Sequence, residues 1–402
     1  MPGIVLGVLW EWAELAVRWL HVVAGIAWIG SSFYFIALDL SLKQRPGLPE
    51  GAGGEAWQVH GGGFYNMVKY LVAPARLPDA LTWFKWEAYT TWLSGMGLLA
   101  LVYYLQAELF MIDATVMDLA PWLAVAISLA GLALGWVVYD LLCRSPLGRN
   151  DAALALVGFV FLVALAYLFT LVFSGRGMMM QLGGLIGTMM VANVFLVIIP
   201  NQKKVVADLL AGRQPDPKLG AQAKQRSLHN NYLTLPVIFT MIANHYPLAF
   251  ASRWNWLILA VVLAMGAVIR HFFNTRHKTG RGPWWTWAAA AAGLAAIVWL
   301  SAQPATRLDT AALPSGADFA EVENVVLSRC SMCHAAEPLW EGVEVPPKGV
   351  VLETPGQIRA HARAIGMQAV HTHAMPPGNV TFIEEGERQL LATWIAAGAP
   401  AW

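Results

Sequence analysis

Eight long apolar runs occupy the first three quarters of the chain. A helix needs about 20 predominantly apolar residues to cross the ~30 Å hydrocarbon core of a bilayer. The runs lie near residues 14–38, 86–107, 120–143, 152–174, 178–200, 229–249, 254–273 and 284–302. Since 57% of the residues are hydrophobic and only 13% are charged, the chain has more apolar surface than one soluble core needs. We therefore expect residues 1–303 to form an eight-helix transmembrane bundle in the lipid bilayer.

Basic residues are distributed unevenly between the connections of these runs. The connections that follow the first, third, fifth and seventh runs carry most of the Lys and Arg, whereas the other three carry only Arg176 and Arg253. By the positive-inside rule, the basic connections face the cytoplasm. This predicts a bacterial inner-membrane protein with both termini in the periplasm. The net charge of +1 argues against a nucleic-acid partner.

The segment "SRCSMCHAAEPLW" (328–340) follows the last apolar run. Its Cys330, Cys333 and His334 form a C-x-x-C-H motif, which is the attachment signature of a c-type haem, with the histidine as an axial iron ligand. A zinc site would need further thiolates or histidines at close spacing, and none follow. The motif predicts one covalent haem c. The charge pattern predicts that this segment lies on the periplasmic side of the membrane.

Residues 304–316 are rich in Pro, Ala and Ser and are expected to form a linker to a small domain over residues 317–402. Apolar residues at helical spacing precede the haem motif, a second amphipathic helix lies near the C-terminus, and "HTHAMPPGN" lies between them. This arrangement resembles the class I cytochromes c. The resemblance implies that Met375 is the sixth iron ligand; His361, His371 and His373 remain alternatives.

Several apolar runs contain polar stretches, among them "RWLHVVAGIAWIGSSFYF", "FKWEAYTTWLSG" and "RSLHNNYLTLPVIFTMIANHY". With eight spans and a terminal cytochrome, the chain resembles the membrane-bound, cytochrome c-linked urate oxidases of bacterial purine catabolism. The resemblance implies an all-α polytopic fold with a small periplasmic cytochrome c domain. It also implies oxidation of urate to 5-hydroxyisourate, with haem c as first electron acceptor and a soluble cytochrome c or terminal oxidase as the next.

Two sets of intramembrane polar residues are candidates for the substrate site, because ionisable groups in a membrane are costly and often functional. The inner set includes Glu87, Asn193 and His229. Electron tunnelling weakens steeply with distance, so a site near the haem domain is favoured. The predicted outer set contains Arg18 to bind the anion, His21 or His245 as the base, and Gln181 and Asn244 to bind the ring edges.

Two further interpretations stay open at this point. The membrane domain could instead be a carrier or a quinol-linked electron conduit, with a haem b between His21 and His245. The Gly-rich "HGGGF" (60–64) is expected to be a flexible cytoplasmic connection without strands.

Overall fold

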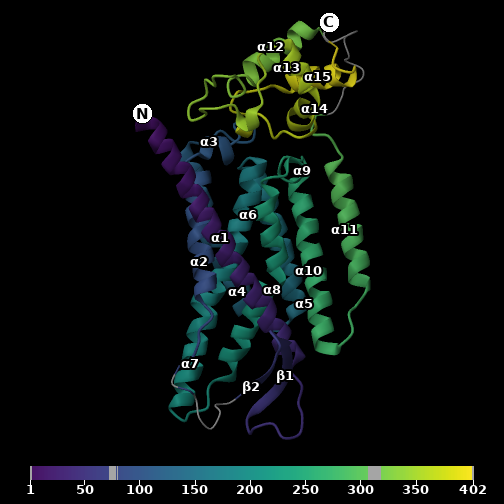
Figure 1. Cartoon of the computed structure of the whole chain (residues 1–402). Coiled ribbons are helices and arrows are strands. Elements are labelled where there is room, and N and C mark those ends of the chain that lie inside the picture. Colours follow the sequence, from purple (N-terminus) through teal and green to yellow (C-terminus); the bar gives the residue numbers. More distant parts are fainter. Residues whose placement is uncertain (1, 72–77, 79, 307–317, 401–402) are drawn as a thin grey trace.

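The computed structural model describes residues 2–71, 78, 80–306 and 318–400. The chain is mostly helical, and its long helices stand side by side in a bundle (Figure 1). The bundle helices are α1 (Pro2–Ser41), α2 (Trp86–Leu98), α4 (Pro121–Arg144), α5 (Asp151–Thr170), α6 (Gly175–Ala192), α7 (Ile199–Leu210), α8 (Pro217–Ala243), α10 (Asn255–Thr279) and α11 (Trp285–Ser301). Shorter segments are η1 (Leu99–Tyr104), α3 (Ala107–Phe110), η2 (Pro146–Arg149), η3 (Asn193–Ile198) and α9 (Pro247–Phe250).

Five helical stretches are long and apolar enough to cross a membrane. They are Gly7–Ser41, Pro121–Arg144, Asp151–Thr170, Gly175–Leu210 and Asn255–Thr279. The other three predicted runs also fall on helices, but these are shorter or more polar: α2 gives way to a π-helical turn, α8 begins with a polar segment, and α11 has only 17 residues. The structure thus has several apolar helices compatible with a membrane protein, and eight crossings stay a prediction.

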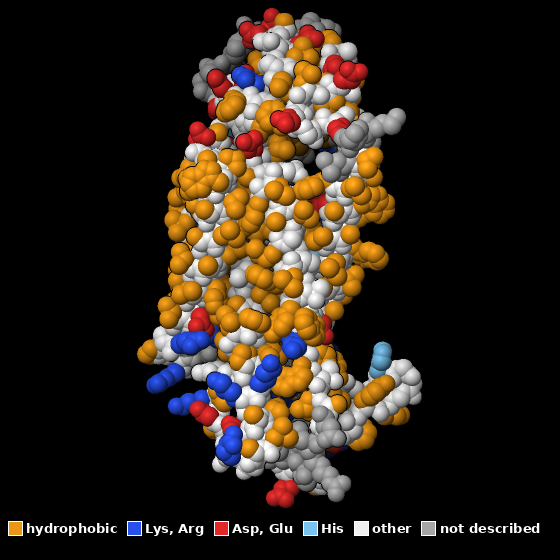
Figure 2. Space-filling model, turned by 90° about the vertical axis from the view of Figure 1, so that its left-hand side faces the viewer, with side chains coloured by type: hydrophobic (Ala, Val, Ile, Leu, Met, Phe, Trp, Pro, Cys, Tyr) orange, Lys and Arg blue, Asp and Glu red, His pale blue; other side chains and the backbone are white. Residues whose placement is uncertain are grey.

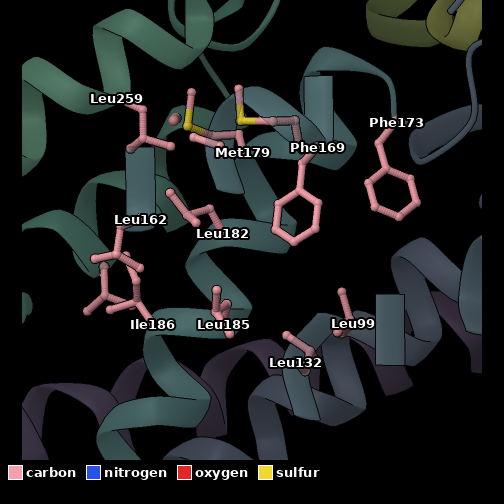
Figure 3. Close-up of a cluster of buried hydrophobic side chains, with 14 of the residues drawn as sticks. Leu99, Leu132, Leu162, Phe169, Phe173, Met179, Leu182, Leu185, Ile186 and Leu259 are labelled. Atoms are coloured by element: carbon pink, nitrogen blue, oxygen red, sulfur yellow. The ribbon is translucent and has the colours of Figure 1, made fainter. Parts of the chain in front are cut away.

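Helix α6 forms the centre of the bundle, packed against α4, α5 and α8. Its Met179, Leu182, Leu185 and Ile186 side chains have no exposed surface (Figure 3). Small residues let the neighbouring helices approach closely, since a side chain at Gly183 would collide with Thr240. The middle of the bundle is therefore a dry, closely packed core.

Residues 52–70 form an antiparallel β-hairpin, so the expectation of a purely helical fold and of a strand-free "HGGGF" segment was wrong. Strand β1 (Ala52–His60) pairs with β2 (Gly63–Tyr70), and His60 lies opposite Gly63. The turn residues Gly61 and Gly62 have φ of 60° and 79°. Two consecutive positive φ angles suit a two-residue hairpin turn, and glycine adopts them without strain.

Residues 318–400, hereafter the C-terminal unit, have a hydrophobic core of their own, in which Val322, Val326, Ile358, Leu391 and Trp394 are fully buried. The elements are α12 (Phe319–Arg329), η4 (Pro347–Gly349), α13 (Pro355–Ala360), α14 (Ala362–Ile365), η5 (Gly366–His371), η6 (Pro377–Asn379) and α15 (Glu385–Ala396). Helix α12 contacts α15. Most of the predicted linker, residues 304–316, lies outside the described residues.

The two ends of the molecule differ in charge. The C-terminal unit covers one end of the bundle, and the hairpin lies at the other (Figure 1). Figure 2 shows a belt of hydrophobic side chains between them, with Lys and Arg gathered at the hairpin end and Asp and Glu at the end of the C-terminal unit. This distribution agrees in sign with the positive-inside pattern of the sequence.

Candidate functional site

The C-terminal unit contacts the bundle through the segment that carries Met375. The His373 amide donates to the Ala251 carbonyl at 3.4 Å, and His371 Nε2 lies 2.9 Å from the Ser301 carbonyl oxygen. Gly378 packs so closely that an added Cβ would lie 2.5 Å from the Ile112 carbonyl oxygen. Residues 371–378, which we call the Met375 loop, therefore rest directly on the end of the bundle.

A cavity of about 170 Å³ lies at this junction. Its polar lining comes from three connections of the bundle and from the Met375 loop. These residues are Asp113, Ser174, Arg176, Ser252, Arg253, Asn255 and His373. Because the connections belong to separate parts of the sequence, only the folded chain brings them together.

Local hydrogen bonds hold the entrance of α6 in place at this cavity. Ser174 caps the helix by accepting from the Gly177 amide at 3.1 Å, and its own amide donates to the Met111 carbonyl at 2.8 Å. Any side chain at Gly175 would collide with the Phe250 carbonyl. The sequence "SGRG" thus begins helix α6. Arg176 lies in the first turn of this helix and packs against Phe250 of α9.

Two guanidinium groups give the cavity its charge. The Nε of Arg253 is buried and has no hydrogen-bond partner among the described residues, while its Cζ lies 5.2 Å from the Trp254 ring centroid. Arg176 Cζ lies 5.2 Å from the Phe110 ring and 4.6 Å from the Phe250 ring. Neither arginine forms an ion pair within the described part of the chain. Two unpaired cations in a small cavity favour an anionic ligand.

The other polar groups supply hydrogen-bonding positions. The Asp113 carboxylate accepts from the Thr115 amide at 2.9 Å, and this turn fixes its direction. His373 Nε2 lies 2.9 Å from the Thr306 hydroxyl. Burial, followed by the positive charge of Arg388, lowers the pKa of His373 to about 4, so its imidazole is neutral. The positive charge of the cavity therefore belongs to the two arginines.

The C-x-x-C-H motif begins at the C-terminal end of α12. Cys330 follows the last residue of α12, and both it and Cys333 are free thiols. His334 Nδ1 lies 3.0 Å from the Val350 carbonyl oxygen. A bond from this nitrogen fixes the imidazole and leaves Nε2 free for a metal. Arg388 Nη1 donates to the Met375 carbonyl at 3.0 Å, which anchors the Met375 loop.

The five residues predicted to bind or convert the substrate lie on α1, on α6 and in the connection that follows α8. Arg18 pairs with Glu14 on its own helix, and His21 Nδ1 lies 2.9 Å from the Thr91 carbonyl oxygen and 3.1 Å from Ser94 Oγ. The two His21 contacts join α1 to α2.

Asn244 follows α8, and its Oδ1 is buried without a partner among the described residues, whereas the adjacent His245 is exposed. The imidazoles of His21 and His245 thus have different surroundings. None of the five predicted residues lines the cavity at the Met375 loop.

Gln181 is held inside the bundle by two bonds to α4. Its Nε2 donates to the Ser128 carbonyl at 2.9 Å, and its Oε1 accepts from Ser128 Oγ at 2.5 Å. The Tyr104 hydroxyl lies 2.8 Å from the same Ser128 Oγ. This network satisfies the Gln181 amide internally.

Replacing Gln181 by Leu is expected to lower stability and not substrate affinity. Loss of its two buried bonds costs about 1–3 kcal/mol. Thermal unfolding in detergent should show a lower midpoint than in the neighbouring Met180→Leu control, with an unchanged KM for the reducing substrate. A raised KM at an unchanged midpoint would instead support a role for Gln181 in binding ring edges.

The inner polar residues form networks toward the hairpin end. Arg226 Nη2 pairs with Asp140 at 2.7 Å, and Asn193 Nδ2 donates to Asn230 Oδ1 at 2.9 Å. His229 Nδ1 lies 2.8 Å from the Tyr139 hydroxyl. These bonds join α4, η3 and α8.

Sequence reasoning did not select Arg176, Arg253 or Asp113 for the substrate site. The signal was present in the charge pattern, because Arg176 and Arg253 are the only basic residues in the three connections predicted to be periplasmic. In the sequence these two arginines bear on the orientation of the chain, and only the structure brings them to one cavity.

Comparison with known proteins gives one match. Residues 7–301 match the family model described as urate oxidase N-terminal. Neither a curated protein nor a solved structure matches the chain.

Proposed function

The chain belongs to the urate oxidase N-terminal family, and from this premise we propose that it is an integral membrane urate oxidase. It converts urate to 5-hydroxyisourate and passes the electrons to a haem c in the C-terminal unit. The C-terminal unit lies in the periplasm of a bacterium, attached to the inner membrane. A soluble cytochrome c or a terminal oxidase receives the electrons next.

The observation that carries the proposal is the cavity under the Met375 loop. Urate is a planar anion at neutral pH, and a volume of about 170 Å³ suits a single bicyclic purine. Arg176 and Arg253 offer two cations that form no ion pair within the described residues. The site therefore matches its proposed ligand in both size and charge.

The position of the cavity also suits electron transfer. His373 and Gly378 of the Met375 loop line the cavity directly, so bound urate would lie beside the segment proposed to ligate the iron. A site at the hairpin end would lie one hydrocarbon thickness, ~30 Å, from the Met375 loop. Transfer over that distance would need another redox group.

The reaction balances with water as the source of the new oxygen. Urate and one water give 5-hydroxyisourate, two protons and two electrons. Arg176 and Arg253 bind the anion and orient its ring, while the Asp113 carboxylate is placed to accept a proton from the attacking water. Haem c, held by Cys330, Cys333, His334 and Met375, would supply the oxidising power by taking the electrons one at a time.

The test is anaerobic reduction of the purified holoprotein by urate. With protein in excess, each urate should reduce the haem of two chains, because the oxidation releases two electrons and each chain holds one haem. Stopped-flow absorbance of the haem bands measures the rate and the stoichiometry, and allantoin, a later purine product without the aromatic ring, is the negative control. Failure of urate to reduce a haem that dithionite reduces would refute the proposal.

A further inference from the structure

A second, larger cavity lies at the hairpin end of the bundle. Its volume is about 690 Å³, and it is bounded by α1, α2, η3, α7, α8 and strand β2. The cavity under the Met375 loop, hereafter the redox cavity, does not share a residue with it. The chain thus has two separate cavities at opposite ends of its apolar belt.

Polar groups line the larger cavity from its mouth at the hairpin to its deep end. Helix α1 runs toward the hairpin end and α8 runs away from it (Figure 1), so Ser31, Ser32 and Asn230 lie deeper than Leu42 and Leu219. A phospholipid would need an apolar deep end for its acyl chains. Polar groups at the deep end, in addition to the Asp39–Lys69 ion pair near the mouth, suit a small polar solute that enters from the hairpin side.

The side chains suit a flat heterocycle with both donors and acceptors on its edges. The indoles of Trp28 and Trp83 line the cavity and offer apolar faces for a ring. The carboxylate of Glu87 and the ammonium of Lys224 also line it, and neither forms an ion pair or a side-chain hydrogen bond among the described residues. A carboxylate accepts from ring N–H groups, and an ammonium binds an anionic oxygen.

A dry core separates the two cavities. The α6 side chains Met179, Leu182, Leu185 and Ile186 are fully buried between them, and Figure 3 shows them packed against α4, α5 and α10. A ligand in the larger cavity therefore cannot reach the smaller one through this arrangement of helices.

We propose that the larger cavity is a second binding site for urate-type purine anions, filled from the hairpin side and independent of the redox cavity. This inference rests on the proposed function, because it takes urate as the ligand. The protein would then bind its substrate at two sites, one on each side of the apolar belt. The basic hairpin end would attract the anion toward this site.

The test counts urate bound to holoprotein whose haem has first been reduced by dithionite, so that oxidation cannot proceed. Anaerobic equilibrium dialysis with radiolabelled urate should give two sites per chain. Ser227→Leu, which places a larger apolar side chain in the wall of the larger cavity, should leave one. Lys224→Met should weaken one site by about 10-fold, since it removes a charged hydrogen bond, whereas the matched exposed control Lys203→Met should keep both.

The outcomes separate this inference from the proposed function. Haem reduction by urate together with a single site that disappears in Arg253→Gln would overturn the second site and leave the oxidase intact. A site that persists in Arg253→Gln and disappears in Ser227→Leu supports the inference, even if urate fails to reduce the haem. Two sites unaffected by both Ser227→Leu and Lys224→Met would place the second site elsewhere and overturn the proposal.

Discussion

Replacing Arg253 by Gln is expected to lower kcat/KM for urate by about 10- to 100-fold. A hydrogen bond to a charged group contributes about 1.5–3 kcal/mol, and each 1.4 kcal/mol corresponds to about a factor of ten. Arg253 is a strong candidate because its buried Nε has no partner among the described residues and is therefore available to a ligand. Stopped-flow haem reduction at several urate concentrations measures the effect.

The control for Arg253→Gln is Arg363→Gln, an exposed arginine of α14 that does not line the cavity. It should keep wild-type kinetics. Reduction by dithionite should be normal in both variants, which shows that the haem itself is intact. Arg176→Gln should resemble Arg253→Gln. If both cavity variants keep wild-type kcat/KM while Arg18→Gln loses it, the site lies among the residues first predicted from the sequence.

Replacing Cys330 and Cys333 together by Ala should remove covalent haem completely and abolish urate-dependent electron transfer. Thioether attachment needs both thiols, and neither is engaged in a disulfide. A pyridine haemochrome spectrum and haem staining of a denaturing gel measure the loss.

The bundle should still fold and insert in the double variant, since its core is separate from that of the C-terminal unit. Cys143→Ala is the matched control, because Cys143 is the remaining thiol and lies within the bundle core on α4. It should keep its covalent haem. Covalent haem that survives in the Cys330/Cys333 variant would contradict the attachment site.

The sequence determined the gross organisation for simple physical reasons. Long apolar runs form helices because backbone groups in a lipid environment must be hydrogen-bonded within the chain. Each predicted run falls on a helix, although only five helical stretches are long and apolar enough to cross a membrane. The hairpin was missed because "HGGGF" was interpreted as a flexible segment, whereas two glycines between alternating strand residues form a tight turn.

Helix rotation was beyond the reach of the sequence. A run that is apolar on every side has no distinct inward face, so nothing in its periodicity showed that His21 faces α2 or that Gln181 bonds to Ser128. The prediction that these residues form one site with Asn244 depends on helix rotations, which the periodicity of the runs does not define.

Only the tertiary structure assembled the cavity under the Met375 loop. Asp113, Arg176, Arg253 and His373 come from four separate segments, and no local pattern links them. Their meeting depends on how the ends of α3, α6 and α10 pack and on how the C-terminal unit docks on them. The two arginines and the haem motif can be recognised in the sequence by itself, because both are defined by local residue types. Their proximity depended on long-range packing, because contacts between distant segments are set by the shapes of whole helices and not by neighbouring residues.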